Sequence, residues 1–153
     1  MTILSDHEIM ECLNKGDIKI SPFEPKCLNP AGYDLRSLCE LSINPKQYVL
    51  AATVEKVKLS LKVLASLHLR SSFAREGVIG SFAVVDPGFC GQLTLALHNN
   101  GKKVVKIQKN ERITQIVFHK LGRVARRGYH GLYQKSVGVV ESRRNADTQQ
   151  SII

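Results

Sequence analysis

The feature that most constrains the fold of this chain is a succession of short apolar runs separated by turn residues. The runs are four to seven residues long and rich in Val, Ile, Leu and Thr: Val49–Ala52, Glu55–Leu59, Val63–Leu69, Gln92–His98, Lys103–Ile107 and Arg112–Phe118. Asn100-Gly101 predicts a hairpin between the runs on either side of it. Many short strands with regular turns indicate a mainly β chain, a sandwich or barrel of the jelly-roll kind.

One helix is expected before the first strand. Ser5 and Glu8 match the capping-box pattern, in which two residues satisfy each other's free backbone N–H groups, and Gly16 is a typical helix end. A length of 153 residues corresponds to one domain, which we place at residues 1–144. The polar stretch 145–153 is predicted to be a loose C-terminal tail.

Positive charge is concentrated in the C-terminal third. The chain has 22 Lys and Arg against 13 Asp and Glu, and residues 101–144 contain twelve basic residues but only Glu111 and Glu141 as acids. Such a segment indicates either a site for a polyanion, such as nucleic acid or a polyphosphate, or a solvated basic face. Charge alone does not separate these two interpretations.

Several common classes are excluded by what the sequence lacks. No apolar run approaches the roughly 20 residues that a membrane helix needs, and the N-terminus does not resemble a secretory signal, so a cytoplasmic location is expected. The four cysteines form no C-x-x-C pair, which argues against a zinc or redox motif and favours buried free thiols. Familiar signatures of phosphate loops, dinucleotide folds, serine hydrolases, zinc proteases and zinc deaminases are absent.

Polar residues at unusual places in the β pattern are the candidates for chemistry. In Arg70–Arg75 two guanidinium groups flank two serine hydroxyls, which suits phosphate oxygens but also fits a hydroxyl-stabilised turn with exposed arginines. Asp86 lies where an apolar run enters a tight turn, which fits either a catalytic acid or an ordinary turn residue. Asp34 has the same two interpretations, and Gln115 interrupts an apolar run and could face solvent or a ligand.

In their order along the chain these segments resemble the motifs of the trimeric dUTPase and dCTP deaminase superfamily. The resemblance covers nearly the whole chain, from about residue 3 to residue 144. The matching segments are Ala31–Leu35, Arg70–Arg75, Val84–Leu95, Glu111–Phe118 and the clasp-like Tyr129–Arg143. The resemblance implies a distorted jelly roll that assembles as a homotrimer, with active sites shared between subunits.

The resemblance allows two chemistries, and Ala96 distinguishes them. In the deaminase branch this position holds a glutamate that moves protons while water attacks cytosine, and a methyl group cannot act as acid or base. In the hydrolase branch an aspartate, matched by Asp86, activates the water that attacks the α-phosphate of dUTP. We therefore predict a dUTP diphosphatase, similar to the archaeal-type dUTPase subgroup, that forms dUMP and pyrophosphate. Two alternatives stay open: a dCTP deaminase, alone or bifunctional, and a weakly active binding or regulatory protein.

The resemblance also implies ligands and roles for individual residues. The expected ligands are dUTP and Mg²⁺, and neither a membrane nor nucleic acid is expected as a partner. Asp86 is the expected catalytic base, and Asp34 the residue that holds Mg²⁺ through its water shell. The expected substrate-binding residues are Arg70, Ser71, Ser72, Arg75, Val85, Phe89, Gln92, Gln115, Tyr129 and Lys135. The clasp departs from its usual pattern at Leu132 and Ser136, where relatives carry Lys and Gln.

Overall fold

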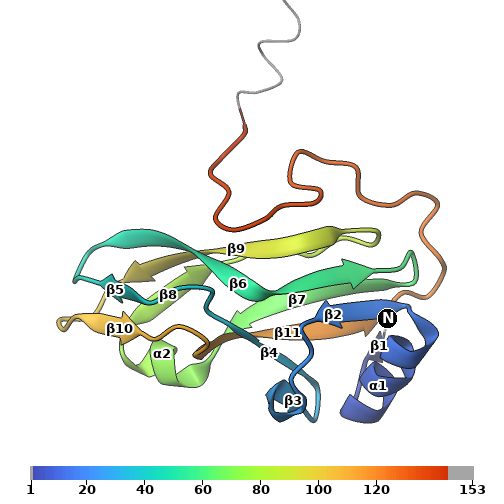
Figure 1. Ribbon diagram of the computed structural model, residues 1–153, viewed down its shortest axis with the longest axis horizontal. Coiled ribbons are helices and arrows are strands. Elements are labelled where there is room, and N and C mark those ends of the chain that lie inside the picture. Colours follow the sequence, from blue (N-terminus) through green and yellow to red (C-terminus); the bar gives the residue numbers. More distant parts are fainter. Residues whose placement is uncertain (1, 145–153) are drawn as a thin grey trace, which may run out of the picture.

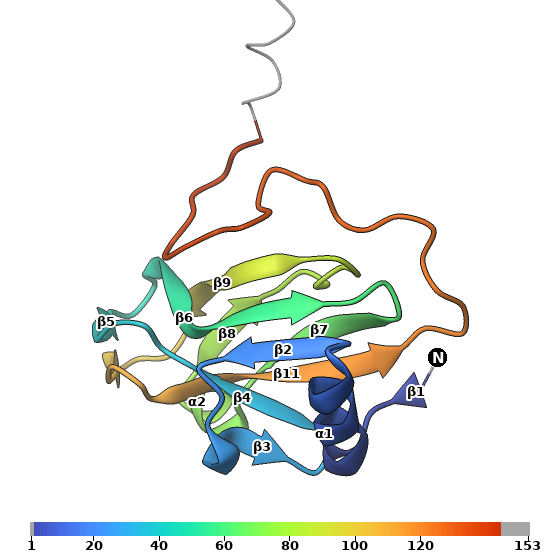
Figure 2. The same cartoon turned by 45° about the vertical axis from the view of Figure 1, so that its right-hand side comes forward.

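A computed structural model describes residues 2–144, which form mainly β-strands (Figures 1 and 2). The strands are β1 Thr2–Ile3, β2 Ile18–Ser21, β3 Leu28–Asn29, β4 Gly32–Arg36, β5 Leu41–Ile43, β6 Tyr48–Leu59, β7 Val63–Leu69, β8 Val78–Ser81, β9 Cys90–Asn99, β10 Val105–Ile107 and β11 Arg112–Lys120. The helical elements are α1 Asp6–Lys15, a 3₁₀ turn η1 at Pro25–Cys27, and α2 Ser71–Arg75. The tail predicted for residues 145–153 lies outside the described residues.

Two large antiparallel sheets and one two-stranded ribbon make up the architecture of the described residues. In the first, β11 pairs with β1, β4 and β7, and β3 extends the sheet beside β4. The second has the strand order β2-β6-β9-β8, and β5 pairs with β10 in a separate two-stranded ribbon. Within residues 2–144 the sheets do not close into a barrel, but they fit an open jelly-roll arrangement. The predicted mainly β fold is confirmed.

Helix α1 begins and ends where the sequence predicts. The Ser5 side chain accepts a hydrogen bond from the Glu8 backbone N–H, and the Glu8 carboxylate accepts one from the Ser5 N–H at 2.9 Å. Gly16 ends the helix in the left-handed conformation at φ 75°, which glycine adopts without steric cost. No helix in the described part of the chain is both long and apolar enough to cross a membrane.

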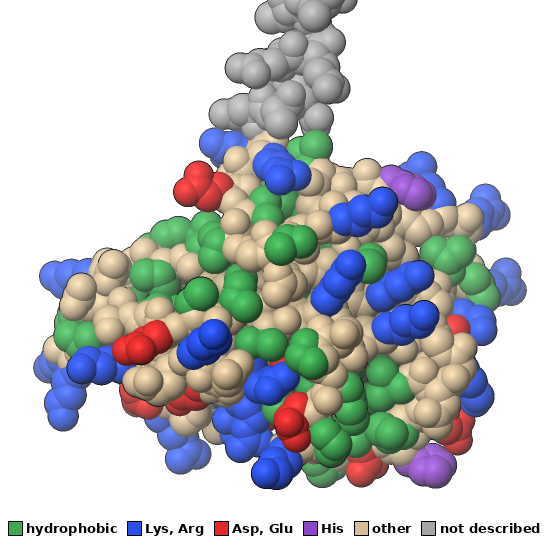
Figure 3. All heavy atoms as spheres, in the orientation of Figure 1, with side chains coloured by type: hydrophobic (Ala, Val, Ile, Leu, Met, Phe, Trp, Pro, Cys, Tyr) green, Lys and Arg blue, Asp and Glu red, His purple; other side chains and the backbone are tan. Residues whose placement is uncertain are grey.

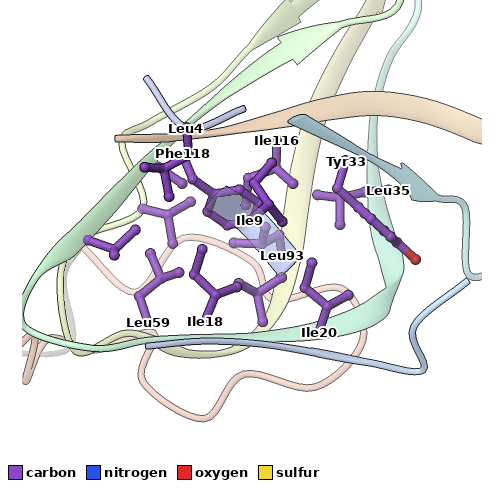
Figure 4. Close-up of a cluster of buried hydrophobic side chains, with 14 of the residues drawn as sticks. Leu4, Ile9, Ile18, Ile20, Tyr33, Leu35, Leu59, Leu93, Ile116 and Phe118 are labelled. Atoms are coloured by element: carbon purple, nitrogen blue, oxygen red, sulfur yellow. The ribbon is translucent and has the colours of Figure 1, made fainter. Parts of the chain in front are cut away.

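A large apolar cluster lies between the two sheets and beneath α1 (Figure 4). Figure 4 labels ten of its buried residues: Leu4, Ile9, Ile18, Ile20, Tyr33, Leu35, Leu59, Leu93, Ile116 and Phe118. Burial raises the pKa of the Tyr33 phenol, whose oxygen accepts a hydrogen bond from the backbone N–H of Glu24. A second cluster, built around Leu95, Leu97 and Ile107, fills the other end of the molecule. These two cores fix the inward face of β9.

Strand β6 joins two of the predicted runs through a bulge. Its register with β9 shifts between Ala52 and Lys56, and Glu55 within the bulge is fully buried. The Glu55 carboxylate accepts hydrogen bonds from the Arg36 backbone N–H at 2.9 Å and from its Nε at 2.6 Å. The bond to Glu55 raises the pKa of Arg36. A buried charge is tolerated here because it is paired and hydrogen-bonded.

The predicted hairpin at Asn100-Gly101 is wrong, because β9 pairs with β6 and β8 while β10 pairs with β5. The Asn99 side chain supplies the reason. Its amide donates to the carbonyls of Ile43 and Lys103, each at 2.8 Å, and its oxygen accepts from the Gly101 N–H. These bonds direct the chain toward β5 instead of back along β9.

All four cysteines are free thiols, but their environments differ. Cys27 is buried, and burial raises its pKa. Cys12 and Cys90 are partly exposed, and Cys39 is exposed. The expectation of buried thiols therefore holds for Cys27 only.

Candidate active site

A cavity of about 370 Å³ lies between the loop at 83–89, the first half of β9 and the C-terminal segment. We call residues 128–143 the arm; it follows β11 and crosses above β9 in orange and red (Figure 1). The lining is mostly apolar; its polar groups are the side chains of Asp86, Gln92, Thr94 and Ser136 and the hydroxyl groups of Tyr129 and Tyr133. A concave apolar pocket of this size with a few polar groups is typical of a small-molecule site.

Asp86 is placed at the cavity by a short bridge and a tight turn. Val85 pairs with Ala65 of β7 through two backbone hydrogen bonds of 2.8 and 2.9 Å, which fixes the chain just before Asp86. The turn continues through Gly88, whose φ of 84° favours glycine. The Asp86 side chain is exposed and is the sole carboxylate among the described residues that line the cavity.

Two aromatic rings form one wall of the cavity. Phe89 is buried, and its ring centroid lies 5.9 Å from that of Tyr129 on the arm, with the planes inclined by 57°. Both line the cavity, as does Val85. Tilted rings at this separation make a favourable contact. The structure thus brings together Val85, Asp86, Phe89 and Tyr129, four of the predicted site residues, whose roles stay a prediction.

Of the other two predicted residues in this region, Gln92 lies on β9 beside the arm and Lys135 is part of the arm. The Gln92 side chain lines the cavity, but its amide donates to the carbonyls of Thr53 and Val54, and its oxygen accepts from the Gly138 N–H at 2.7 Å. Lys135 is exposed, and only its backbone N–H is engaged, donating to the Cys90 carbonyl at 2.7 Å. The Lys135 side chain is not part of the cavity lining.

Two further predicted residues, Asp34 and Arg70, form a charged cluster with Arg112 at the end of β7, and we call these three residues the Asp34 cluster. The Asp34 carboxylate is buried, 3.3 Å from Arg70 Nε and 3.7 Å from an Arg112 nitrogen. Gln115, on β11, lies directly opposite Asp34 on the neighbouring strand β4 and opposite His68 on the other neighbour, β7. None of these residues lines the cavity around Asp86.

The remaining predicted residues lie on α2, directly after Arg70. This segment is a five-residue helix, and not the hydroxyl-stabilised turn that was one of its two interpretations. Phe73 is buried and anchors the helix, whereas Ser71, Ser72 and Arg75 are exposed. Their side chains are available to a ligand or a neighbouring subunit, and they also lie outside the cavity around Asp86.

A single subunit therefore holds two separate groups of motif residues. Sequence reasoning missed several members of the cavity, namely Leu67, Thr94, Tyr133 and Val140. Tyr133 belongs to the clasp-like segment and could have been included on that ground. Thr94 lies in the matching segment Val84–Leu95 and could have been included in the same way. Leu67 carries no local signal, because only the pairing of distant strands brings it to the cavity.

Ala96 lies on the outward face of β9, in register with Leu50 on β6 and Ser81 on β8. It lines neither the cavity around Asp86 nor the neighbouring cleft. Its partners across the sheet also lack carboxyl groups. Within the sheet, therefore, neither neighbour replaces the acid that position 96 lacks.

A second cleft of about 490 Å³ lies on the other side of Asp86, and it is lined partly by Arg127, Tyr129 and His130. Arg123, Arg126 and Arg127 are exposed in the segment after β11. Figure 3 shows Lys and Arg side chains over much of the right half of the face that it presents, and further ones along its left and lower edges. This distribution agrees with either a polyanion site or a solvated basic face.

The residues present do not fit a magnesium ion held by the protein. Asp34, the predicted ligand through water, already faces two guanidinium groups. Among residues 2–144 no group of three or more His, Cys, Asp or Glu side chains could hold a metal. This geometry favours an ion-pairing role for Asp34 in the single subunit.

Comparison with known proteins defines the class to which this fold and cavity belong. A family model described as dCTP deaminase-like matches residues 38–121. The chain is 42% identical over 157 residues to a protein named dCTP deaminase from Thermococcus sibiricus, covering 93% of this chain and 97% of that one. It is 35% identical over 175 residues to "dCTP deaminase, dUMP-forming" from Aquifex aeolicus, covering 96% and 97%.

Solved structures agree on the fold. A dCTP deaminase from Agrobacterium tumefaciens aligns with a TM-score of 0.67 at 17% identity, over 78% of this chain and 48% of that one. Native EIAV dUTPase aligns with a TM-score of 0.60 at 18% identity, over 75% and 96%. The chain has the distorted jelly roll of the dUTPase-like kind, and it belongs to the dCTP deaminase-like family.

The prediction of dUTP hydrolysis as the main activity is wrong on these findings. Relatives from Pyrococcus abyssi and Thermococcus kodakarensis, 42% and 43% identical to this chain, are also named dCTP deaminase. A less similar relative from Sulfolobus islandicus rod-shaped virus 1, 33% identical over 90% of this chain, is named probable deoxyuridine 5'-triphosphate nucleotidohydrolase. The dUTPase structures are below 20% identity and share only the fold. The prediction relied on the missing acid at Ala96, and that single position does not outweigh similarity along the whole chain.

Proposed function

We propose that the chain is a dCTP deaminase. In this reaction water adds to C4 of the cytosine ring, the C4–N4 bond breaks, and dCTP and water become dUTP and ammonia. The observation that carries the proposal is 42% identity along 93% of the chain to a protein of that name. The apolar cavity beside Asp86 supports it, since a nucleoside needs a largely dry pocket with few polar contacts.

Deamination requires one proton to leave the attacking water and one to reach the departing nitrogen. Ala96 cannot move either proton, so another group has to do so. We assign this role to Asp86, because it is the carboxylate that lines the cavity among the described residues. A carboxylate that accepts the first proton as a general base, and then delivers a proton as a general acid, contributes about 10²–10⁴-fold to the rate of such a reaction.

In the proposal, the Asp34 cluster and α2 contribute to the active site of a neighbouring subunit in a homotrimer. Ser71 and Arg75 are exposed and lie outside the cavity of their own chain. A homotrimer would place α2 of one subunit against the Asp86 cavity of the next, as heterologous contacts in a closed ring do. The guanidinium of Arg75 would then bind phosphate oxygens, and Ser71 would orient the water or the base.

Magnesium enters the proposal only as the counter-ion of the nucleotide triphosphate. Mg²⁺ keeps several of its waters and is commonly bound by substrate phosphates together with few protein groups. The Asp34 carboxylate is paired with arginines, so we assign no protein ligand to the ion. No step of the deamination depends on it.

Incubation of the protein with dCTP, followed by separation of the nucleotides and an ammonia assay, tests the proposal. We expect dUTP and ammonia in equal amounts; dUMP in place of dUTP would match the dUMP-forming relative and retain the deamination step. dUTP supplied alone is the matched control. Breakdown of dUTP with no conversion of dCTP would contradict the proposal.

Ala96 favours a second candidate, a nucleotide-binding protein with little turnover. The cavity, its aromatic wall and the arm are all present without the acid at position 96. Calorimetry with dCTP distinguishes the candidates in the same preparation. Binding without release of ammonia favours the second candidate, and binding with ammonia release favours the first.

A further inference from the structure

We propose that Glu55 is a positioning residue for the active-site cavity. It holds the β6 bulge, which we define as residues 53–55, and the bulge in turn fixes Gln92 and Leu93 in the cavity wall. Glu55 does not line the cavity itself, so it acts through the bulge. Its effect on dCTP rests on the proposed function, whereas its effect on the backbone of β9 does not.

The β6 bulge lies directly opposite a stretch of β9 that lines the cavity. Ala52 pairs with Thr94 of β9, and Lys56 pairs with Gln92, so the three residues of the bulge face Leu93 alone. Bulges bend a strand and are frequent beside active sites, where they redirect side chains. The shape of this bulge therefore determines where Leu93 and its two neighbours lie in the cavity wall.

Hydrogen bonds join the bulge to β9 at both of these residues. The Gln92 amide donates to the carbonyls of Thr53 and Val54 at 3.0 and 3.2 Å. The Leu93 N–H donates to the Thr53 hydroxyl at 3.0 Å, and that hydroxyl donates to the Glu55 carbonyl at 2.8 Å. Thr53 is fully buried, so water does not compete for these bonds.

The Glu55 carboxylate anchors the bulge to the other sheet. It is fully buried and accepts from the Arg36 backbone N–H at 2.9 Å and from the Arg36 Nε at 2.6 Å. The next residue, Ser37, forms an isolated bridge with Thr53 of the bulge. Because Arg36 and Asp34 lie on the same strand, β4, the bulge connects the strand of the Asp34 cluster to the wall of the cavity.

Stability alone is a weak reason for a buried ion pair at this place. Removing two charges from water costs free energy that only good geometry offsets, and apolar residues of similar volume often give equal or greater stability. A carboxylate with two directed hydrogen bonds, however, fixes a backbone at a defined distance, which apolar contacts do not. This property suits a residue that positions the cavity wall.

Hydrogen exchange at Leu93 tests the anchoring without any need for activity. Glu55→Ala removes both bonds to Arg36, so the Leu93 amide should exchange at least about tenfold faster relative to the amide of Ile116 on β11. The ratio to Ile116 cancels a general loss of stability. Ile107→Ala, which truncates a buried side chain in the second apolar cluster, is the matched control and should leave the ratio unchanged.

Turnover of dCTP separates positioning from stability. Thr53→Val removes the hydroxyl at nearly constant shape, so it should raise KM about tenfold or more and change kcat by less than about threefold, because Asp86 is retained. Glu55→Ala should have the same effect. Thr53→Ser keeps the hydroxyl and should hold KM within about threefold of the unmodified protein. Ile107→Ala should lower the urea midpoint without changing KM.

The inference is overturned if folded Glu55→Ala leaves the Leu93 exchange ratio unchanged, or if Thr53→Val has the same KM as Ile107→Ala. Should Glu55→Ala fail to fold, Glu55→Gln decides the question. It loses one of the two carboxylate oxygens, so a ratio raised by about threefold or more supports the inference and an unchanged ratio overturns it. Absence of dCTP turnover in every variant would count against the proposed function, while the exchange ratio would still decide whether Glu55 holds the cavity wall.

Discussion

The Asp86 cavity and the Asp34 cluster are both built from motif residues, but they differ in almost every physical respect. The cavity is apolar and presents one exposed carboxylate with no ion-pair partner among the described side chains. The Asp34 carboxylate, in contrast, is buried between two arginines. An unpaired carboxylate is available for proton transfer, whereas a paired one mainly stabilises its surroundings.

This difference shows which half of a site each region supplies. In our proposal the cavity holds the nucleoside and provides an acid. The lining of the cavity contains no Lys or Arg, and the one arginine beside it is Arg127, which lines the neighbouring cleft among the described residues. The region of Arg70 and Arg75 has the cations but no described cavity beside it. The proposed trimer follows from this complementarity, because each subunit would complete the site of its neighbour.

Asp86→Asn should give the largest effect on activity. The amide has the same shape but cannot accept a proton, so dCTP conversion should fall by about 100-fold or more. Stability should stay within about 0.5 kcal/mol of the unmodified protein, since the side chain is exposed. Ammonia release and urea unfolding measure the two quantities, and activity above a tenth of the original would remove Asp86 from its assigned role.

Arg75→Ala should lower activity with little effect on folding. The side chain is exposed, and loss of a charge-assisted contact to phosphate should raise KM for dCTP by about tenfold. Arg123→Ala, which removes an exposed arginine in the segment after β11, is the control. Equal KM values for both variants would show that α2 does not contact the nucleotide.

Asp34→Asn should show the reverse pattern, with its main effect on stability. Removing the buried charge leaves Arg70 and Arg112 facing each other, at a cost of about 1–2 kcal/mol given that both arginines are partly exposed. Urea unfolding measures the change against Asp86→Asn as the matched aspartate variant. If the two variants unfold at the same urea concentration, the Asp34 carboxylate does not stabilise the fold more than the Asp86 carboxylate does, which would contradict the prediction.

Light scattering should show the smallest change across these variants. All of them should keep the mass of the unmodified protein, about 51 kDa for three chains of 17.0 kDa, because none removes a large apolar surface. A stable and active species at the mass of one chain would contradict a site completed by a neighbouring subunit.

Much of this architecture could be predicted from local sequence. The capping box at Ser5 and Glu8 and the mainly β character follow from short-range patterns, and the structure confirms both. The prediction of a hairpin at Asn100-Gly101 was wrong because the Asn99 side chain donates a hydrogen bond to Ile43 of β5, which lies far away in sequence. Long-range hydrogen bonds of this kind leave no local signal.

The candidate site was predicted in part, and for a similar reason. Val85, Phe89 and Tyr129 do meet at Asp86, because they are carried on segments with recognisable motifs. The bonds of Gln92 to the β6 bulge and to the arm could not be foreseen from its neighbours in sequence. The wrong choice of hydrolase came from Ala96, where a missing acid says nothing about which other group reaches the substrate.

Complementation between two variants that are both impaired, assayed at dCTP concentrations well below KM, tests the shared site most directly. Chains carrying Asp86→Asn are co-expressed with chains carrying Arg75→Ala, and the mixed assemblies are assayed with dCTP beside each variant alone. If every site joins the Asp86 cavity of one subunit to the Arg75 region of the next, about one quarter of the sites in a random trimer regain both groups. We predict that the mixture recovers activity approaching that fraction. Activity no higher than the average of the two variants alone would contradict a site completed between subunits.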